Sequence, residues 1–174
     1  MKKKVLSEID LYAEEVKIPC GFKIDRKLIL SRILYNCFIE RKSFDSRNTF
    51  EVTHSKEMGW FSEYISEHMY LRHGLDLEHY KHYSLILYPG EMRAIRNEHT
   101  LSPLSNYTAI YGVDVPKNST EFILNFKDKN KLKTHREEIY DNKFVLFPSN
   151  ENYFLAKNTS SHLICFLICN YKRP

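Results

Sequence analysis

The sequence changes character at residue 83. From there to the C-terminus, short runs of β-branched, aromatic and aliphatic residues alternate with turn residues, and no helical periodicity comes between them. The predicted strands cover 83–88, 91–97, 106–115, 120–126, 143–147, 152–156 and 162–171. Because parallel strands need long crossover connections, these closely spaced strands are predicted to pair antiparallel, in a jelly roll or barrel.

The residues before this boundary are predicted to supply helices. Segments 26–41 and 61–72 each place apolar residues at helical spacing, with charged residues opposite. We expect both helices to pack on the outside of a sheet. The expected organisation is one domain over 1–174, mainly β with flanking helices, in which 1–82 form a helical N-terminal part and 83–174 the jelly-roll core.

The charge of the chain is only mildly positive. Lys and Arg number 26 against 22 Asp and Glu, a formal charge of +4, and they are spread along the chain. A surplus of this size does not indicate a nucleic-acid partner, so none is expected. The stretch KDKNKLKTHREE at 127–138 is accordingly predicted to be a solvated loop.

Nothing in the sequence indicates a membrane protein. No apolar run approaches the roughly 20 residues of a membrane helix. The basic start at 2–4 is followed by acidic residues, not by the apolar centre of a secretion signal. We therefore expect a cytoplasmic protein without a membrane partner.

The sequence lacks the residue patterns of several common catalytic and binding sites. The five glycines form no phosphate-binding loop, and no GxSxG or HExxH pattern occurs. Cys20, Cys37, Cys165 and Cys169 have no CxxC spacing, and we expect reduced thiols in the core.

Histidine is the remaining residue type that could carry chemistry. The eight histidines are His54, His68, His73, His79, His82, His99, His135 and His162. Those from His68 to His99 crowd the boundary between the two parts of the chain, where histidines usually lie at the surface without a ligand. Only His99 and His162 lie where the predicted strands would direct a side chain inward.

Two segments resemble a known family. They are NYTAIYGVDVPKNSTEFILNF (106–126) and FVLFPSNENYFLAKNTSSHLICFLICNY (144–171). Together they resemble the core of the 2-oxoglutarate/iron(II)-dependent oxygenases, especially oxygenase-like proteins of bacteriophages and marine bacteria. The match includes YGVDVPKNS from Tyr111, the Phe-Pro-Ser turn that ends at Ser149, and the turn before the last strand with Asn158 and Ser160. The resemblance implies a double-stranded β-helix, a cupin-like jelly roll, and a phage-encoded protein would act in the infected cell or virion.

The resemblance also implies where iron and 2-oxoglutarate would bind. The family's distal histidine stands four residues beyond the serine of Phe-Pro-Ser, which in this chain is Tyr153. An arginine for 2-oxoglutarate should open the last strand, where His162 and Ile164 stand instead. Neither is a permanent cation that could bind a carboxylate with two hydrogen bonds.

The first ligand position of the family is equally incomplete. Counting back from Pro116, the family's His-x-His ligand pair falls at Thr100 and Ser102. If the alignment shifts by one residue, the pair falls at His99 and Leu101. At most one ligand of three remains. The candidate ligand-binding residues are therefore His99, Tyr153, His162 and Tyr111, and His99 is the candidate metal ligand.

Three interpretations follow. In the first, which we adopt, the jelly roll has lost its metal, needs no cofactor, and binds a small molecule or a protein or serves as a structural part. In the second, it is an active oxygenase that uses iron(II) and 2-oxoglutarate, with ligands such as His99, Glu98 and a histidine from 68–82. In the third, it is a cupin-like module, in keeping with the turn at 88–91.

Overall fold

The computed structural model describes residues 2–6, 9–17, 27, 31, 35, 49–51, 56–95, 106–150 and 152–174. The strands are β1 (Lys2–Leu6), β2 (Ile9–Glu15), β3 (Thr49–Glu51), β4 (Glu78–Leu87), β5 (Arg93–Ile95), β6 (Tyr107–Asp114), β7 (Glu121–Asp128), β8 (Lys131–Glu138), β9 (Lys143–Pro148), β10 (Asn152–Leu155) and β11 (Ile164–Lys172). The helix α2 (Lys56–His73) lies between β3 and β4.

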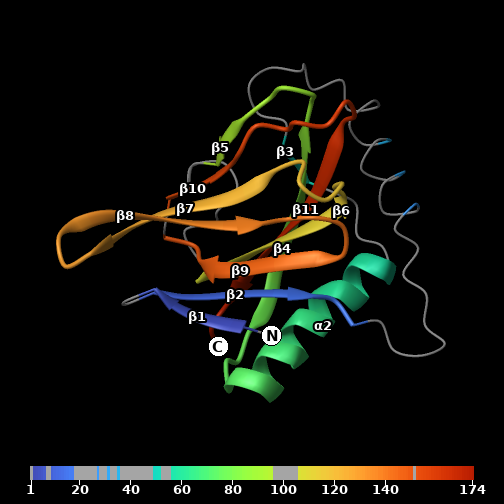
Figure 1. Cartoon of the computed structure of the whole chain (residues 1–174). Helices are drawn as coiled ribbons and strands as arrows, with labels where there is room; N and C mark the ends of the chain where they lie inside the picture. Colours follow the sequence, from blue (N-terminus) through green and yellow to red (C-terminus); the bar gives the residue numbers. More distant parts are fainter. Residues whose placement is uncertain are drawn as a thin grey trace.

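The described strands form two facing sheets (Figure 1). The large sheet has the order β1-β2-β9-β6-β11-β4-β3 and the small sheet the order β5-β10-β7-β8. Neighbouring strands pair antiparallel throughout. From β4 onward, successive strands mostly alternate between the two sheets, which is the double-stranded β-helix that the strand rhythm predicted.

The main core lies between the two sheets. The strand pattern predicts two facing sheets with seven residues mostly buried between them, and this prediction is confirmed. All seven are fully buried: Ile110, Phe122, Leu124, Val145, Phe147, Phe166 and Ile168. In β7, buried side chains alternate with partly exposed ones, because the small sheet is covered on one face only. In β11, eight consecutive residues are buried, so the large sheet is covered on both faces.

Helix α2 covers the outer face of the large sheet. Phe61, Ile65 and Met69 lie on one side of the helix and join a second core with Tyr111 and Leu167. The helix predicted at 61–72 is thus confirmed. None of the described residues belongs to a helix long and apolar enough to span a membrane.

The other predicted helix, at 26–41, lies mostly outside the described residues. Lys27, Ser31 and Tyr35 are helical and exposed. The cysteine prediction is confirmed for Cys165 and Cys169, which are buried thiols outside any disulfide bond.

Two predictions were wrong. Residues 1–82 are not a purely helical part packed on the sheet, because β1, β2 and β3 belong to the large sheet. Residues 127–138 are not a loop, because most of them form β8 and the end of β7. Seven of the eight β8 residues are hydrophilic, so no apolar alternation marked the strand in the sequence.

Gly112 in β6 lies close to the backbone of Tyr140, and the large sheet depends on this close approach. A Cβ atom at this position would lie 2.2 Å from the backbone oxygen of Tyr140. Asn142 N donates to Gly112 O at 2.9 Å, so the segment that enters β9 is held against β6 here.

Replacing Gly112 by alanine should therefore destabilise the fold by at least about 3 kcal/mol, because backbone atoms must move. Gly74→Ala is the matched control. Gly74 has a φ of +63° with no atom within 4 Å, so only backbone strain of about 1–2 kcal/mol applies. Urea unfolding of both variants measures the difference, and an equal loss of stability would contradict the close contact.

The core under α2 should make stability depend on alkaline pH. Burial raises the pKa of the Cys169 thiol from 9.0 to about 12, and burial also raises the pKa of Tyr171 well above 10.0. Since the folded state holds these protons more tightly, the free energy of unfolding is undiminished below about pH 9 and falls as the pH rises towards 12.

Cys169→Ala should make this fall less steep, although Tyr171 still contributes. Urea midpoints of the wild type and the variant at about pH 8 and about pH 10.5 measure the effect. The same pH dependence in both proteins would show that the Cys169 thiol is not the group responsible.

Candidate functional site

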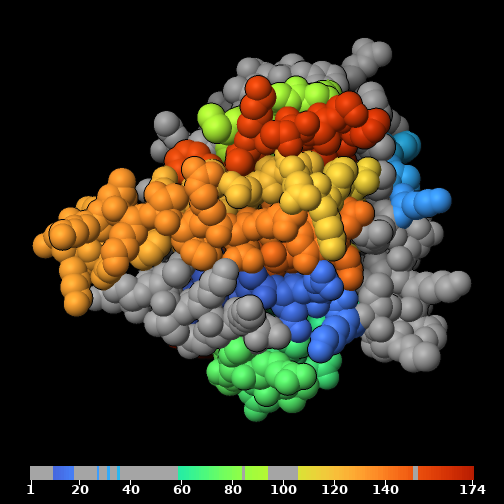
Figure 2. Space-filling view, in the orientation of Figure 1, coloured from blue at the N-terminus to red at the C-terminus, as the bar shows by residue number. Residues whose placement is uncertain are grey.

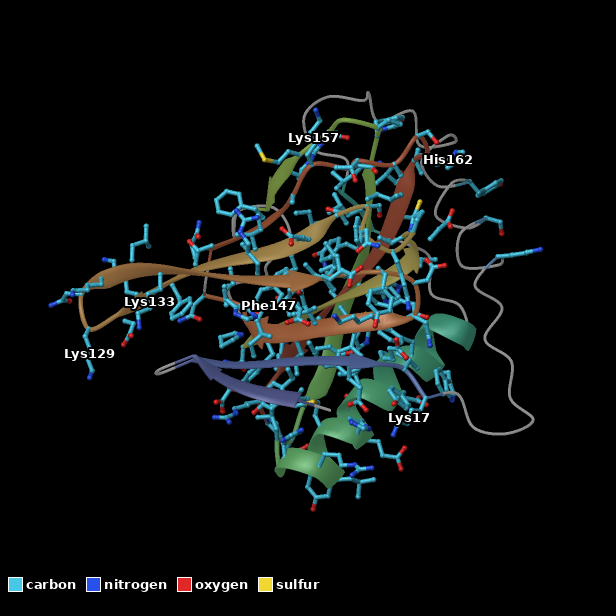
Figure 3. The ribbon with its side chains drawn as sticks, viewed as in Figure 1. Lys17, Lys129, Lys133, Phe147, Lys157 and His162 are labelled. Carbon is cyan, nitrogen blue, oxygen red and sulfur yellow. The ribbon has the colours of Figure 1, made fainter. Side chains whose placement is uncertain are left out.

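Tyr153, where the resemblance expects a histidine, is part of the core between the sheets. It lies on β10 with 1% of its surface exposed. Its ring meets the edge of Phe147 from the large sheet, with 4.5 Å between ring centroids, and lies 5.7 Å from Phe122 of β7. Figure 3 labels Phe147 near the middle of the molecule. The position therefore holds an aromatic contact between the two sheets.

A row of polar side chains crosses the inner face of the large sheet next to this contact. Phe147 pairs with Thr108, Thr108 with Asn170, and Asn170 with Lys81. Paired residues point to the same face of a sheet. Thr108 and Asn170 lie two residues from Ile110 and Ile168, which belong to the core between the sheets, so the row faces inward.

Hydrogen bonds join three side chains in this region. Thr108 Oγ1 donates to Asn170 Oδ1 at 3.1 Å and lies 2.9 Å from Ser149 Oγ. Thr108 and Asn170 are fully buried and Ser149 is 4% exposed, while Lys81 is half-buried and lies over the Tyr83 ring. We call Lys81, Asn170, Thr108 and Ser149 the polar row. The ammonium of Lys81 is the group of this row that a ligand could reach, since Thr108 and Asn170 are fully buried.

The start of β11 lacks a cation. His162 is exposed and lies near the edge of the molecule in Figure 3. Its carbonyl accepts hydrogen bonds from Asn158 Nδ2 at 2.8 Å and Ser160 Oγ at 2.9 Å, so the matching turn residues hold backbone atoms. Ile164 is fully buried in the core between the sheets. Neither residue places a charge inside the barrel.

Tyr111 lies on the opposite face of the large sheet from Tyr153. Its ring is 4.2 Å from that of Phe61 on α2, and its hydroxyl donates to Asn142 Oδ1 at 3.1 Å. Tyr111 therefore belongs to the core under the helix. The structure does not bring Tyr111, Tyr153 and His162 together.

His99, the candidate metal ligand, lies outside the described residues, as do Thr100 and Ser102. The register of the small sheet does give one relevant fact. Tyr153 pairs with Ile95 of β5, so an apolar residue stands opposite it on the neighbouring strand.

The histidines from 68 to 82 lie on the helix side of the large sheet. His68 Nε2 is 2.7 Å from Glu14 Oε2, and the ring of His73 is 4.6 Å from that of Tyr12. The rings of His79 and His82 stack at 5.4 Å. Their strand partners in β11, Tyr171 and Cys169, belong to the core under α2. These histidines therefore do not face the barrel interior.

The described donors do not form a site suited to iron(II). Within the part of the chain that the structure describes, no three His, Cys, Asp or Glu side chains are grouped to hold a metal ion. The inner face near Tyr153 presents hydroxyl, amide and phenol groups, whereas iron(II) oxygenases use imidazole and carboxylate ligands.

A separate cavity of about 470 Å³ lies at the surface, near the turn that precedes β7. Its lining includes Asn118, Glu121, Glu138 and Lys157. The hydroxyl of Thr120 in its wall already donates to Ala156 O at 2.7 Å, and Asn118 N donates to Glu138 at 2.9 Å. These groups stabilise the turn, and the cavity is not part of the barrel interior.

No family model matches the sequence, and no curated protein matches it. Solved structures do match the fold. AviO1 from Streptomyces viridochromogenes Tue57 aligns with a TM-score of 0.63 at 10% identity, over 94% of this chain and 90% of AviO1. The non-heme alpha ketoglutarate dependent carbocyclase SnoK from nogalamycin biosynthesis aligns with a TM-score of 0.62 at 13% identity, over 92% and 78%.

HygX from Streptomyces hygroscopicus, with nickel and 2-oxoglutarate bound, aligns with a TM-score of 0.59 at 8% identity, over 94% of this chain and 82% of HygX. The resemblance to the 2-oxoglutarate oxygenase superfamily is thereby confirmed for the fold. At these identities the fold is all that the similarity establishes. The bacteriophage and marine subtype stays a prediction.

Because the Tyr153 ring is packed between the sheets, replacing it by alanine should cost more stability than replacing it by phenylalanine. Tyr153→Ala should lower the free energy of unfolding by about 3–5 kcal/mol, because a large buried ring is lost. Tyr153→Phe keeps the ring and should cost no more than about 1.5 kcal/mol, the value of a hydrogen bond. Chemical denaturation of both variants measures the two losses. A small loss for Tyr153→Ala would mean that the ring does not join the sheets.

Proposed function

We propose that this protein is a non-catalytic binding protein built on the double-stranded β-helix of the 2-oxoglutarate oxygenases. The observation that carries the proposal is the packing of Tyr153, which is buried against Phe147 at the position that the resemblance assigns to a histidine. A ring that joins the two sheets in this way has a structural role. It is not placed as one of several preset ligands around an open metal position.

The chemistry of the donors supports the same conclusion. A neutral phenol is a poor replacement for imidazole, because iron(II) sites gain affinity from several preset nitrogen and carboxylate ligands. At the start of β11, Ile164 is buried and uncharged. Without a guanidinium there, the far carboxylate of 2-oxoglutarate would find no partner at the start of β11 that makes two hydrogen bonds to it.

The ligand that fits the described residues best is a small polar molecule that binds at Lys81, the partly exposed member of the polar row. The Lys81 ammonium favours a negatively charged group, while Asn170, Thr108 and Ser149 are buried and bonded to one another. A segment of a protein partner is the other occupant that Lys81 would suit. We expect binding in the cytoplasm or, for a phage-encoded protein, in the infected cell or virion.

The second candidate function is an active oxygenase that uses iron(II) and 2-oxoglutarate. Its support is the fold shared with the alpha ketoglutarate dependent SnoK and with HygX. In that case His99 would be one ligand. The described histidines from 68 to 82 lie on the other face of the large sheet, so the remaining ligands would have to come from elsewhere.

Isothermal titration of the purified protein with manganese(II), followed by 2-oxoglutarate, separates the two candidates. The binding-protein proposal predicts no stoichiometric metal uptake and no 2-oxoglutarate binding in the micromolar range, which corresponds to roughly 8 kcal/mol. The titration is repeated anaerobically with iron(II).

His99→Ala is the matched control. If the wild type does not bind metal, both proteins give the same flat titration. Stoichiometric uptake by the wild type that is lost in His99→Ala would overturn the proposal and identify His99 as a ligand of an active metal site.

A further inference from the structure

The strands β7 and β8 form a long hairpin that projects from the body of the molecule (Figures 1 and 2). Its ladder is continuous from Glu121 paired with Glu138 to Asp128 paired with Lys131. The sequence had indicated a loop over the same residues. Since the segment is a paired ribbon, its side chains keep fixed positions along two faces.

Positive charge gathers at the tip of this hairpin. Between residues 127 and 133 the chain carries four lysines and one aspartate, a net charge of +3. The aspartate, Asp128, is paired with Lys133. The base of the hairpin is acidic instead, because Glu121, Glu137 and Glu138 outnumber Arg136. Arg136 pairs with Glu121, and Lys143 of β9 pairs with Glu137. We call residues 127–133 the cationic tip.

The lysines lie on both faces of the ribbon and at its end. Lys133 pairs with Phe126, whose side chain points to the core, while Lys127 pairs with Leu132 on the other face. Lys129 is in the turn, and Figure 3 labels it at the far end of the hairpin. Lys127, Lys129, Lys131 and Lys133 are all exposed. A flat acidic protein surface would meet only one of these faces.

Lys129 in the turn has a backbone conformation that is unfavourable for lysine. Lys129 and Asn130 both have positive φ, at 46° and 64°. Two-residue turns with two positive φ values favour Asn and Gly, because other side chains are strained in this region. A lysine at this position therefore retains charge at the tip at the expense of turn stability, which indicates a use for the charge.

We propose that the cationic tip binds the phosphate backbone of double-stranded nucleic acid by entering a groove. A two-stranded ribbon fits the major groove of DNA, where phosphates line both sides. Lysines on both faces of the ribbon complement that arrangement. The lysines neutralise phosphates, which are the same for every sequence, so the proposed binding is mainly independent of sequence. The overall charge of +4 gave no sign of this, because it does not show that four lysines meet at one turn.

Salt dependence of binding provides the test. Fluorescence anisotropy with a labelled DNA duplex of about 20 base pairs should give a slope of log K against log salt near −3, since each neutralised phosphate contributes about −0.9. This slope corresponds to an affinity loss of about 50-fold between about 50 and about 200 mM KCl. Replacing all four lysines by glutamine should abolish binding.

Lys129→Asn separates charge from folding. Asparagine is favoured in this turn, so the melting temperature should stay the same or rise. The salt slope should become smaller by about 0.9, as one phosphate contact is lost. Lys17→Gln is the matched control, because Lys17 is an exposed lysine on a different element and its removal should leave the slope unchanged.

Three results would overturn the proposal. The first is absence of duplex binding by the wild type at low salt. The second is an equal slope for the wild type and Lys129→Asn. The third is binding of poly-L-glutamate with no binding of the duplex, which would assign the tip to an acidic protein. Neither the proposal nor its test depends on whether the barrel binds a metal.

Discussion

The fold depends on aromatic contact between its two sheets. Phe147 of the large sheet lies 4.8 Å from Phe122 and 4.5 Å from Tyr153, ring centre to ring centre, and both partners belong to the small sheet. Each ring buries a large apolar surface, and edge-to-face pairs add a favourable term. By the resemblance in sequence, Tyr153 in this cluster stands where the oxygenase family has an iron-binding histidine. The same contact therefore supplies stability and decides the functional interpretation.

The large sheet separates two environments. On its inner face lie the aromatic cluster and the polar row that begins at Thr108. On its outer face lie α2 and the histidines from 68 to 82, with His68 beside Glu14. A reaction centre that combined these histidines with Tyr153 would need atoms from both sides of a packed sheet. The geometry assigns the histidines to the contact between α2 and the sheet.

Much of the barrel could be predicted from the sequence, because its strands carry apolar residues in short runs between turns. β8 could not, because it is polar on both faces and is defined by its ladder with β7. That Tyr153 stands where the oxygenase family has a histidine stays a prediction; the structure shows its ring buried between the two sheets. Tyr111 was predicted in the wrong environment, although the sequence contained the information needed to place it. Tyr111 follows Ile110, which was predicted to be buried between the sheets, and neighbouring residues on a strand point to opposite faces. Its partner Phe61 is distant in sequence, so that contact could not be foreseen.

The proposed function depends on the packing of Tyr153 against Phe147 in place of a metal centre. The most direct measurement is anomalous X-ray diffraction at the manganese edge, from crystals grown with manganese(II) and 2-oxoglutarate. The account predicts no manganese peak inside the barrel and a Tyr153 ring packed against Phe147. A manganese peak between β5 and β10, with 2-oxoglutarate bound to it and the Tyr153 ring displaced, would contradict it.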